Sequence, residues 1–123
     1  MILIVESDFS YVQRLRDAIR RQRGVEVHLA SDGLEALRWL RDSSPELILV
    51  DQAASWIDGF RLCRLIKFHK GKQQIPVLLM TMVADEDHRR LAEAVKADGY
   101  LEKKGDLGPL LQRVKQILNP QKP

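Results

Sequence analysis

Five short apolar segments, separated by longer segments of mixed polarity, restrict the folds open to this chain of 123 residues. The apolar runs are continuous rather than alternating, which is typical of parallel strands buried on both faces of a sheet. The connections between them are long enough for right-handed crossovers to a parallel neighbour. The candidate strands span residues 2–5, 25–30, 47–50, 77–81 and 100–101.

Apolar residues recur at helical spacing in the segments that follow each candidate strand. The sequence therefore repeats a strand and a helix five times. This pattern predicts an α/β fold, a doubly wound (βα)5 three-layer sandwich with a five-stranded parallel sheet. Representative apolar positions are Leu15 and Ile19, Leu37 and Leu40, Cys63 and Ile66, Leu91 and Val95, and Leu110 and Val114.

Glycine, proline and aspartate mark several expected helix ends. Gly24 and Gly99 fit the residue that follows the last turn of a helix. Asp106 is expected to cap the start of the last helix, because Pro109 fits its first turn.

Length and composition favour one domain over residues 1–119, with residues 120–123 as a tail or the start of a linker. The formal net charge of +3 is too small, and the arginines of the first helix too dispersed, for a nucleic-acid surface. No apolar stretch is long enough for a membrane span. The single cysteine, Cys63, has no partner motif, so we expect a reducing, cytoplasmic location.

Charged and hydroxyl side chains follow several of the candidate strands. In a doubly wound sheet the carboxyl ends of the strands form the ligand site, so we expect these side chains to converge there. Carboxylates this close repel one another unless a cation lies between them, and Mg²⁺ fits that role. Two simpler interpretations stay open: the first two acids could favour the start of a helix, and the lysine could belong to a solvated basic pair. The converging residues are Glu6, Asp8, Asp51, Thr81 and Lys103.

Six segments taken in order resemble the receiver domains of response regulators, the phosphoacceptor modules of two-component signalling. The resemblance covers essentially the whole chain and implies a flavodoxin-like fold with strand order 2-1-3-4-5. The segments are ILIVESD at 2–8, ASDGLEAL at 30–37, PELILVD at 45–51, DGF at 58–60, IPVLLMT at 75–81 and ADGYLEK at 97–103.

The resemblance implies a role for four residues. Asp51 falls on the acceptor that takes a phosphoryl group from a phosphohistidine of a histidine kinase or a phosphotransfer protein. Thr81 and Lys103 fall on the hydroxyl and the ammonium that contact this group, and Tyr100 falls on the aromatic switch position. The switch implies an effector protein or a fused output domain, and a homodimer through the fourth and fifth helices is possible.

The resemblance also implies a metal site made from Glu6, Asp8, Asp51 and the backbone carbonyl of Ala53. Receivers normally place a second acid directly after the first, where this chain has Ser7. One anionic ligand is thus missing, and we expect a weakened Mg²⁺ site.

Other departures from the receiver pattern bear on activity. Met82 stands where receivers carry a small residue, so its side chain could obstruct a phosphodonor. Ala53 and Val83 are apolar at the two positions that tune dephosphorylation and cannot orient a hydrolytic water, which predicts slow self-dephosphorylation. The alternative function is a pseudo-receiver, a protein-interaction module that works without phosphorylation. A flavodoxin fits poorly, because ESDFSY lacks a glycine-rich phosphate cradle.

Overall fold

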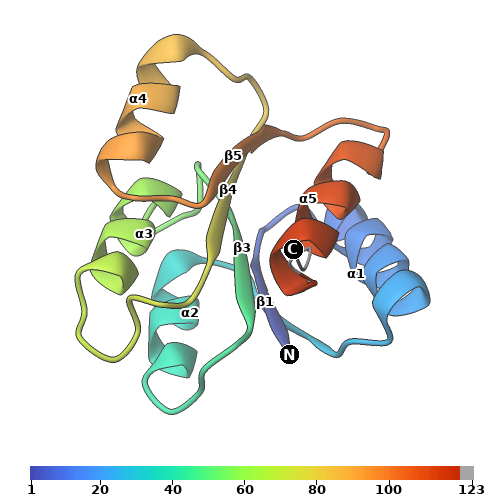
Figure 1. The fold of residues 1–123 in the computed structure, drawn as a ribbon, viewed down its shortest axis with the longest axis horizontal. Helices are drawn as coiled ribbons and strands as arrows, with labels where there is room; N and C mark the ends of the chain where they lie inside the picture. The colour runs from blue at the N-terminus through green and yellow to red at the C-terminus, as the bar shows by residue number, and fades with distance from the viewer. Residues whose placement is uncertain (120–123) are drawn as a thin grey trace.

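The computed structural model describes residues 1–119, apart from the side chain of Arg23, and consists of five strands that alternate with five helices (Figure 1). The predicted (βα)5 sandwich is confirmed, because all strands are parallel and lie in the order β2-β1-β3-β4-β5. The elements are β1 (Ile2–Val5), α1 (Phe9–Arg23), β2 (Val27–Ala30), α2 (Gly33–Leu40), β3 (Leu47–Asp51), α3 (Gly59–Lys67), β4 (Val77–Thr81), α4 (Glu86–Ala94), β5 (Gly99–Glu102) and α5 (Gly108–Leu118).

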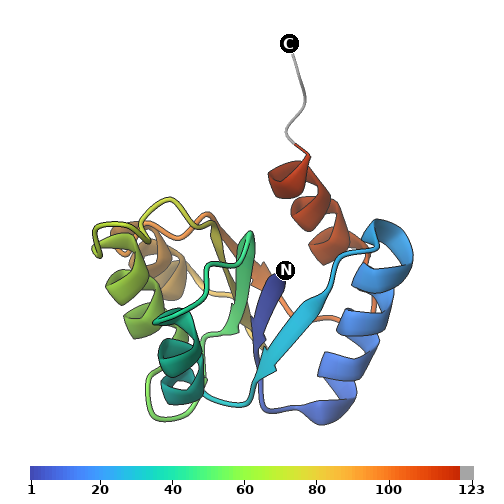
Figure 2. The same ribbon diagram turned by 90° about the horizontal axis from the view of Figure 1, so that it is seen from below.

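Helices cover both faces of the sheet and so complete three layers (Figure 2). Helices α1 and α5 lie on one face, and α2, α3 and α4 lie on the other. The central strands are buried throughout, and successive residues enter opposite cores: Ile2 packs with Leu15 of α1, whereas Leu3 packs with Leu62 of α3. This two-sided burial explains why the strand sequences are apolar without alternation.

Two strands differ in length from their predicted ranges. Strand β2 begins at Val27 rather than at residue 25, because its pairing with β1 starts where Ile2 lies opposite Val27. Strand β5 begins earlier than predicted, at Gly99, which lies opposite Leu78. The assignment of Gly99 to a helix end is therefore wrong. A side chain at Gly99 would collide with Leu78, so close packing of β5 on β4 accounts for this glycine.

The predicted end of α1 is confirmed, whereas the predicted capping residue of α5 is wrong. Gly24 ends α1 as predicted, with φ of 63° and its N–H donating to the carbonyl of Arg20. Helix α5 begins two residues after Asp106, so Leu107 rather than Asp106 holds the capping position. The Asp106 carboxylate still accepts a hydrogen bond of 2.9 Å from the Gly108 N–H, and Pro109 lies in the first turn as expected.

Cys63 on α3 is fully buried between the sheet and the α4 end, and its Sγ lies 3.5 Å from the Val95 carbonyl. Burial raises the pKa of this thiol to about 12. Within residues 1–119, none of the helices combines the length and apolarity that a bilayer crossing requires. The predicted tail or linker at residues 120–123 lies outside the described residues.

Candidate functional site

Four adjacent strands deliver polar side chains to one edge of the sheet. Strands β1, β3, β4 and β5 are neighbours and parallel, so their carboxyl ends meet at this edge. Glu6 follows β1, Asp51 ends β3, Thr81 ends β4 and Lys103 follows β5. A backbone hydrogen bond of 2.7 Å from the Lys103 N–H to the Thr81 carbonyl extends the β4–β5 pairing and fixes the path of the chain into Lys103.

The Lys103 ammonium lies between two carboxylates. Its Nζ is 2.9 Å from Oε1 of Glu6 and 3.1 Å from Oδ2 of Asp51. The side chain of Lys103 is 7% exposed, that of Glu6 is 1% exposed and that of Asp51 is 13% exposed. The Tyr11 ring lies beneath the ammonium, with its centroid 5.2 Å from Nζ. One cation and two anions are thus held in a largely dry site, with a net formal charge of −1.

Burial and hydrogen bonding act against each other in this cluster. Burial raises the pKa of Glu6, and the hydrogen bond from Lys103 opposes part of that rise. Burial alone would lower the pKa of Lys103, but hydrogen bonds to Glu6 and Asp51 outweigh it and hold that pKa above its usual value. Burial also raises the pKa of Tyr11. The ammonium of Lys103 therefore stays charged at neutral pH.

Asp51 is the more exposed carboxylate of the cluster. Its Oδ1 accepts a hydrogen bond of 3.1 Å from the Ala53 N–H, while Oδ2 contacts Lys103. It lines a cavity of about 280 Å³ whose other walls come from the loops after β3 and β4 and from the start of α4. Met82 lies at the rim of this cavity with most of its side chain in solvent. The walls include Gln52, Ala53, Thr81, Val83 and His88.

Thr81 and Tyr100 are both buried near the cavity but bond to different groups. The Thr81 hydroxyl donates to the Val83 carbonyl at 3.1 Å and accepts from the Val83 N–H at 3.3 Å. The Tyr100 hydroxyl donates to Oε1 of Gln52 at 3.2 Å. The structure therefore connects Tyr100 to the residue beside Asp51 and holds Thr81 in a local turn.

Asp8 lies apart from the paired carboxylates and caps α1. Its Oδ1 accepts a hydrogen bond of 3.2 Å from the Tyr11 N–H, the arrangement expected of a capping aspartate. Its own N–H donates to Oε2 of Glu6 at 3.1 Å, so both oxygens of Glu6 are engaged. In this conformation Asp8 acts as an acid at the start of a helix, which was the simpler of the two interpretations from the sequence.

The oxygen atoms at this edge match part of what Mg²⁺ requires. Residues 1–119 hold no group of three or more histidine, cysteine or acidic side chains arranged to bind a metal. Two carboxylates, from Glu6 and Asp51, do come together beside the backbone of Ala53. One or two carboxylates with phosphate oxygens and waters are a usual Mg²⁺ environment, so the donor set fits this ion incompletely.

Two glycines let the loop after β3 pack closely on its neighbours. The Gly33 N–H at the start of α2 donates to the Ser55 carbonyl at 3.0 Å, and a Cβ at Gly33 would overlap the Ile57 backbone. A Cβ at Gly59 would lie 2.8 Å from the Asp51 carbonyl oxygen. Only residues without a side chain allow these approaches, which hold the loop beside Asp51.

Sequence reasoning did not assign Tyr11, Gln52 or His88 to this site. Tyr11 could have been found from the first helix, because it lies one turn after Asp8 and faces the sheet. Gln52 directly follows Asp51, but its bond to Tyr100 joins residues 48 positions apart and has no local signal. The His88 ring is held by a contact of 2.7 Å between its Nδ1 and Oδ2 of Asp85.

Comparison with known proteins identifies the family. The response regulator receiver domain family matches residues 2–115. A putative response regulator from Chloroflexus aurantiacus is 31% identical, with a TM-score of 0.86 and 95% of each chain covered. The phosphorylated cyanobacterial phytochrome response regulator RcpA is 26% identical, with a TM-score of 0.86, and the match covers 98% of this chain and 95% of RcpA.

Among curated proteins, the alkaline phosphatase synthesis transcriptional regulatory protein PhoP of Bacillus subtilis is 32% identical over 117 residues. This match covers 95% of the present chain and 48% of PhoP. The chain spans about half the length of the curated relatives it matches. The match to the family over nearly every residue, together with the parallel five-stranded fold, shows that this chain belongs to the response regulator receiver domain family.

Proposed function

We propose that this receiver domain, residues 1–119, accepts a phosphoryl group on Asp51 from a phosphohistidine donor. The observation that carries the proposal is the contact of 3.1 Å between Asp51 and the Lys103 ammonium at the border of an open cavity. A solved relative, RcpA, is described as phosphorylated, which supports the same chemistry here. An Asp51 oxygen would attack phosphorus as the phosphorus–nitrogen bond breaks, and the released imidazole would take up a proton.

Asp51 suits the acceptor role better than its neighbour Glu6. Both oxygens of Glu6 are hydrogen-bonded and its side chain is almost fully buried. Asp51 is more exposed and lines the cavity, so a phosphoryl group can approach it. Lys103 would keep Asp51 ionised before transfer and would neutralise phosphoryl oxygens afterwards.

Members of the receiver family bind Mg²⁺, and we propose a weakened site for it here, made by Glu6, Asp51 and the Ala53 carbonyl. When bound, the ion supplies positive charge to the phosphoryl oxygens. Asp8 would join the site only by giving up its hydrogen bond to the Tyr11 N–H. We expect the variant Ser7→Asp to bind Mg²⁺ more tightly than the parent chain in calorimetric titrations, with Ser7→Asn as the matched neutral control. Equal affinity in all three proteins would contradict the weakened site.

The switch would pass through Thr81 and Tyr100. A phosphoryl group on Asp51 would offer the Thr81 hydroxyl a charged acceptor in place of the Val83 carbonyl. Tyr100 would respond through Gln52, which follows Asp51 and accepts its hydrogen bond. Because Ala53 and Val83 present no polar side chain to a water molecule, we expect slow self-dephosphorylation, and decay of the phosphorylated form within seconds would contradict this.

Receiver domains interact with histidine kinases or phosphotransfer proteins and with output domains. For this chain we propose a cytoplasmic donor of that kind, docked over exposed apolar side chains around the acceptor loops. Trp56, 79% exposed, and the strongly exposed Met82 and Val83 are suited to such contact. Met82 would then contact the donor at the cavity rim as well as narrow the access to Asp51. The proposed downstream partners are an effector protein or a fused output domain, and a second copy of the chain in a homodimer through α4 and α5.

Intact-mass spectrometry after incubation with acetyl phosphate and Mg²⁺ tests the proposal. We expect one phosphoryl adduct on the parent chain and none on Asp51→Asn. Asp58→Asn is the matched control, because asparagine also caps helices and Asp58 caps α3 outside both the proposed acceptor and the metal site. An adduct that persists in Asp51→Asn would overturn the assignment of the acceptor.

The alternative, a pseudo-receiver that binds partners without phosphorylation, is favoured by one specific observation. Lys103 engages both Glu6 and Asp51, and Asp8 is held as a helix cap, so these three acids already have protein partners. Absence of any adduct at high Mg²⁺ concentration, in a protein shown to be folded, would select this alternative.

A further inference from the structure

A groove between α2 and α3 lies away from the phosphoacceptor. Its volume is about 390 Å³, and its apolar walls come from Leu37 and Leu40 of α2 and from Leu65 and Ile66 of α3. Both helices start near the carboxyl edge of the sheet and run back, so these residues of their final turns lie toward the opposite, amino-terminal edge. The groove therefore shares no lining residue with the cavity beside Asp51.

Positively charged and basic side chains surround this groove. Arg41, His69 and Lys72 line it together with the apolar walls. The Lys72 ammonium donates to the carbonyl of Ser43 at 3.0 Å and to the hydroxyl of Ser44 at 3.3 Å, both neutral acceptors. Within residues 1–119, Arg41 and Lys72 form no ion pair with a carboxylate. The described residues thus leave these two rim cations without a paired carboxylate.

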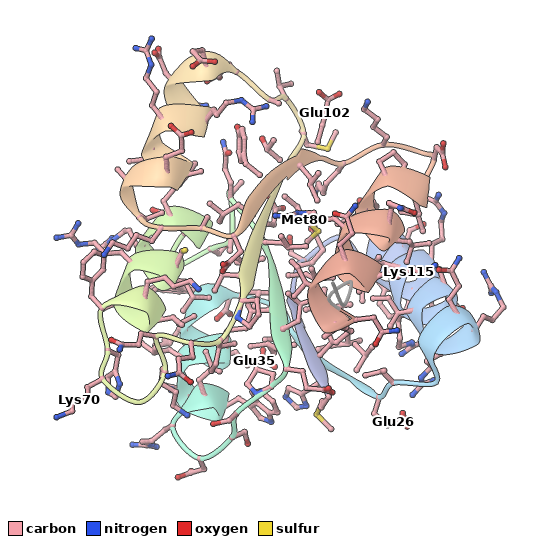
Figure 3. The ribbon with its side chains drawn as sticks, in the orientation of Figure 1. Glu26, Glu35, Lys70, Met80, Glu102 and Lys115 are labelled. Carbon is pink, nitrogen blue, oxygen red and sulfur yellow. The ribbon has the colours of Figure 1, made fainter. Side chains whose placement is uncertain are left out.

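The sequence extends this positive surface beyond the groove. Residues 59–84 contain five lysines and arginines and no aspartate or glutamate. Lys70 projects outward from the turn after α3 at the lower left of Figure 3. Of the five, Lys67 is paired with Asp98, which leaves the others available to an external anion. The cations are Arg61, Arg64, Lys67, Lys70 and Lys72.

Apolar surface continues from the groove onto the outer side of α3. Leu65 is 48% exposed and Phe68 is 55% exposed. Arg64 and Lys96 both contact the Phe68 ring, with 5.3 Å from the Arg64 guanidinium carbon to the ring centroid and 5.0 Å from Lys96 Nζ. This surface combines an apolar centre with a cationic surround. A partner that fills it must be apolar where it enters and negatively charged where it meets the rim.

We propose that the α2–α3 groove docks an acidic amphipathic helix of a partner protein. Such a helix places apolar side chains at one-turn spacing into a groove and carboxylates along its flanks. The groove is large enough for apolar anchors, while the dispersed cations match a row of carboxylates rather than one small anion. The proposal stands apart from the proposed phosphorylation of Asp51, because it concerns a different edge of the molecule.

The probe is a fluorescein-labelled peptide of about 18 residues, with leucines at one-turn spacing and glutamates on the other face. Fluorescence anisotropy measures its binding to the full chain. A second peptide with lysine in place of glutamate, and a third with the leucines and glutamates shuffled, are the controls. We expect the acidic peptide to bind, the lysine peptide not to bind, and the shuffled peptide to bind at least about tenfold more weakly.

Variants of the protein locate the binding. Arg41→Glu reverses an exposed charge at the rim, and we expect it to weaken binding about tenfold. Leu65→Gln removes exposed apolar surface and should weaken binding about fivefold. Lys115→Glu carries the same charge change on α5, across the sheet from the groove (Figure 3), and should leave the affinity within about twofold. Unchanged thermal unfolding in each variant excludes loss of the fold.

Several outcomes would overturn the proposal. Equal binding of the acidic and lysine peptides would remove the electrostatic argument, and equal weakening by Arg41→Glu and Lys115→Glu would remove the location. Binding to phosphatidylglycerol vesicles, but not to the acidic peptide, would assign the surface to a membrane instead. Self-association in sedimentation experiments that Leu65→Gln abolishes, without peptide binding, would assign it to a second copy of this chain.

Discussion

Two buried lysines lie at opposite edges of the sheet, and their surroundings differ in charge. At the amino-terminal edge, Lys67 Nζ lies 2.6 Å from Asp98 Oδ2 and also donates to the Ile75 carbonyl at 2.9 Å. The same Asp98 oxygen accepts from the Val77 N–H at 2.8 Å. At the carboxyl edge, the Lys103 ammonium donates to two carboxylates and, within residues 1–119, to no backbone carbonyl.

The comparison separates a balanced ion pair from a cluster whose charges do not balance. The Lys67 pair is neutral overall, and its remaining hydrogen bonds go to backbone groups at the start of β4. The Lys103 cluster has one carboxylate in excess, and Asp51 borders a cavity. Burial of charge occurs at both edges, so burial alone does not distinguish them. The unbalanced charge beside a cavity distinguishes the edge for which we propose a function.

The largest expected effect comes from removing each lysine in turn. Lys103→Met leaves Glu6 and Asp51 without their cation in a dry site, and we expect the free energy of unfolding to fall by about 3 kcal/mol. Lys67→Met should cost about 1 kcal/mol, because the Asp98 side chain is 39% exposed and water can solvate it. Urea denaturation at neutral pH measures both losses.

A double variant checks the cause of the Lys103 effect. Glu6→Gln combined with Lys103→Met removes one of the two stranded charges, so its loss should be smaller than that of Lys103→Met by about 1 kcal/mol. If Lys67→Met and Lys103→Met cost the same, the distinction between the two edges fails.

The next effect concerns the close packing that holds the loop after β3 at the carboxyl edge. Gly33→Ala forces the Ile57 backbone to move, and we expect a loss of about 2 kcal/mol in the free energy of unfolding. The control is Gly105→Ala, since nothing lies within 4 Å of a Cβ at Gly105. It should change stability by less than about 0.5 kcal/mol. Equal losses in thermal or urea unfolding would show that the loop is not held by this contact.

A smaller effect is expected for the neutral hydrogen bond at the same edge. Tyr100→Phe removes the donor to Gln52 and keeps the ring, so it should lower the free energy of unfolding by about 1 kcal/mol. Gln52→Leu tests the other partner, and the loss in the double variant should be less than the sum of the two single losses. Strict additivity would mean that the bond contributes nothing in solution.

The smallest effect is a dependence on pH that belongs to Glu6. Burial raises the pKa of this carboxyl above its ordinary 4.5, so its contribution to stability is fully present below 4.5 and is lost as the pH rises through the raised value. As the pH rises from 4.5 through the raised pKa, the free energy of unfolding of the parent chain should fall. We expect this fall to be smaller in Glu6→Gln, which has no carboxyl group to ionise at this position. Glu102→Gln, which changes an exposed glutamate, is the control. Parallel pH profiles for parent and Glu6→Gln would contradict the raised pKa of Glu6.

The fold could be predicted because its signals are local and repeated. Continuous apolar strands such as residues 47–50 require cover on both faces, and long amphipathic segments supply it. The meeting of Glu6, Asp51 and Lys103 followed from parallel strands whose ends lie at one edge. Where two interpretations shared a signal, prediction was weaker: Gly99 satisfied the rule for a helix end but serves the packing of β5 on Leu78.

The finer geometry of the site depends on contacts that no local pattern encodes. An acid between a strand and a helix can bind a cation or cap the helix, and only the structure places Asp8 in the capping position. The partners of Lys103 come from positions 97 and 52 residues away. The sequence likewise does not reveal that the packing of the loop after β3 depends on Gly33, because the colliding atoms belong to the distant Ile57.

The burial of Cys63 has a practical consequence for anyone who studies this chain. A thiol whose pKa is about 12 is almost entirely protonated at the pH used for maleimide or iodoacetamide reagents, and it has no exposed surface for them to reach. A cysteine engineered elsewhere on the exterior can therefore carry a spin label or a dye in a background that stays unmodified, with the natural residue left in place.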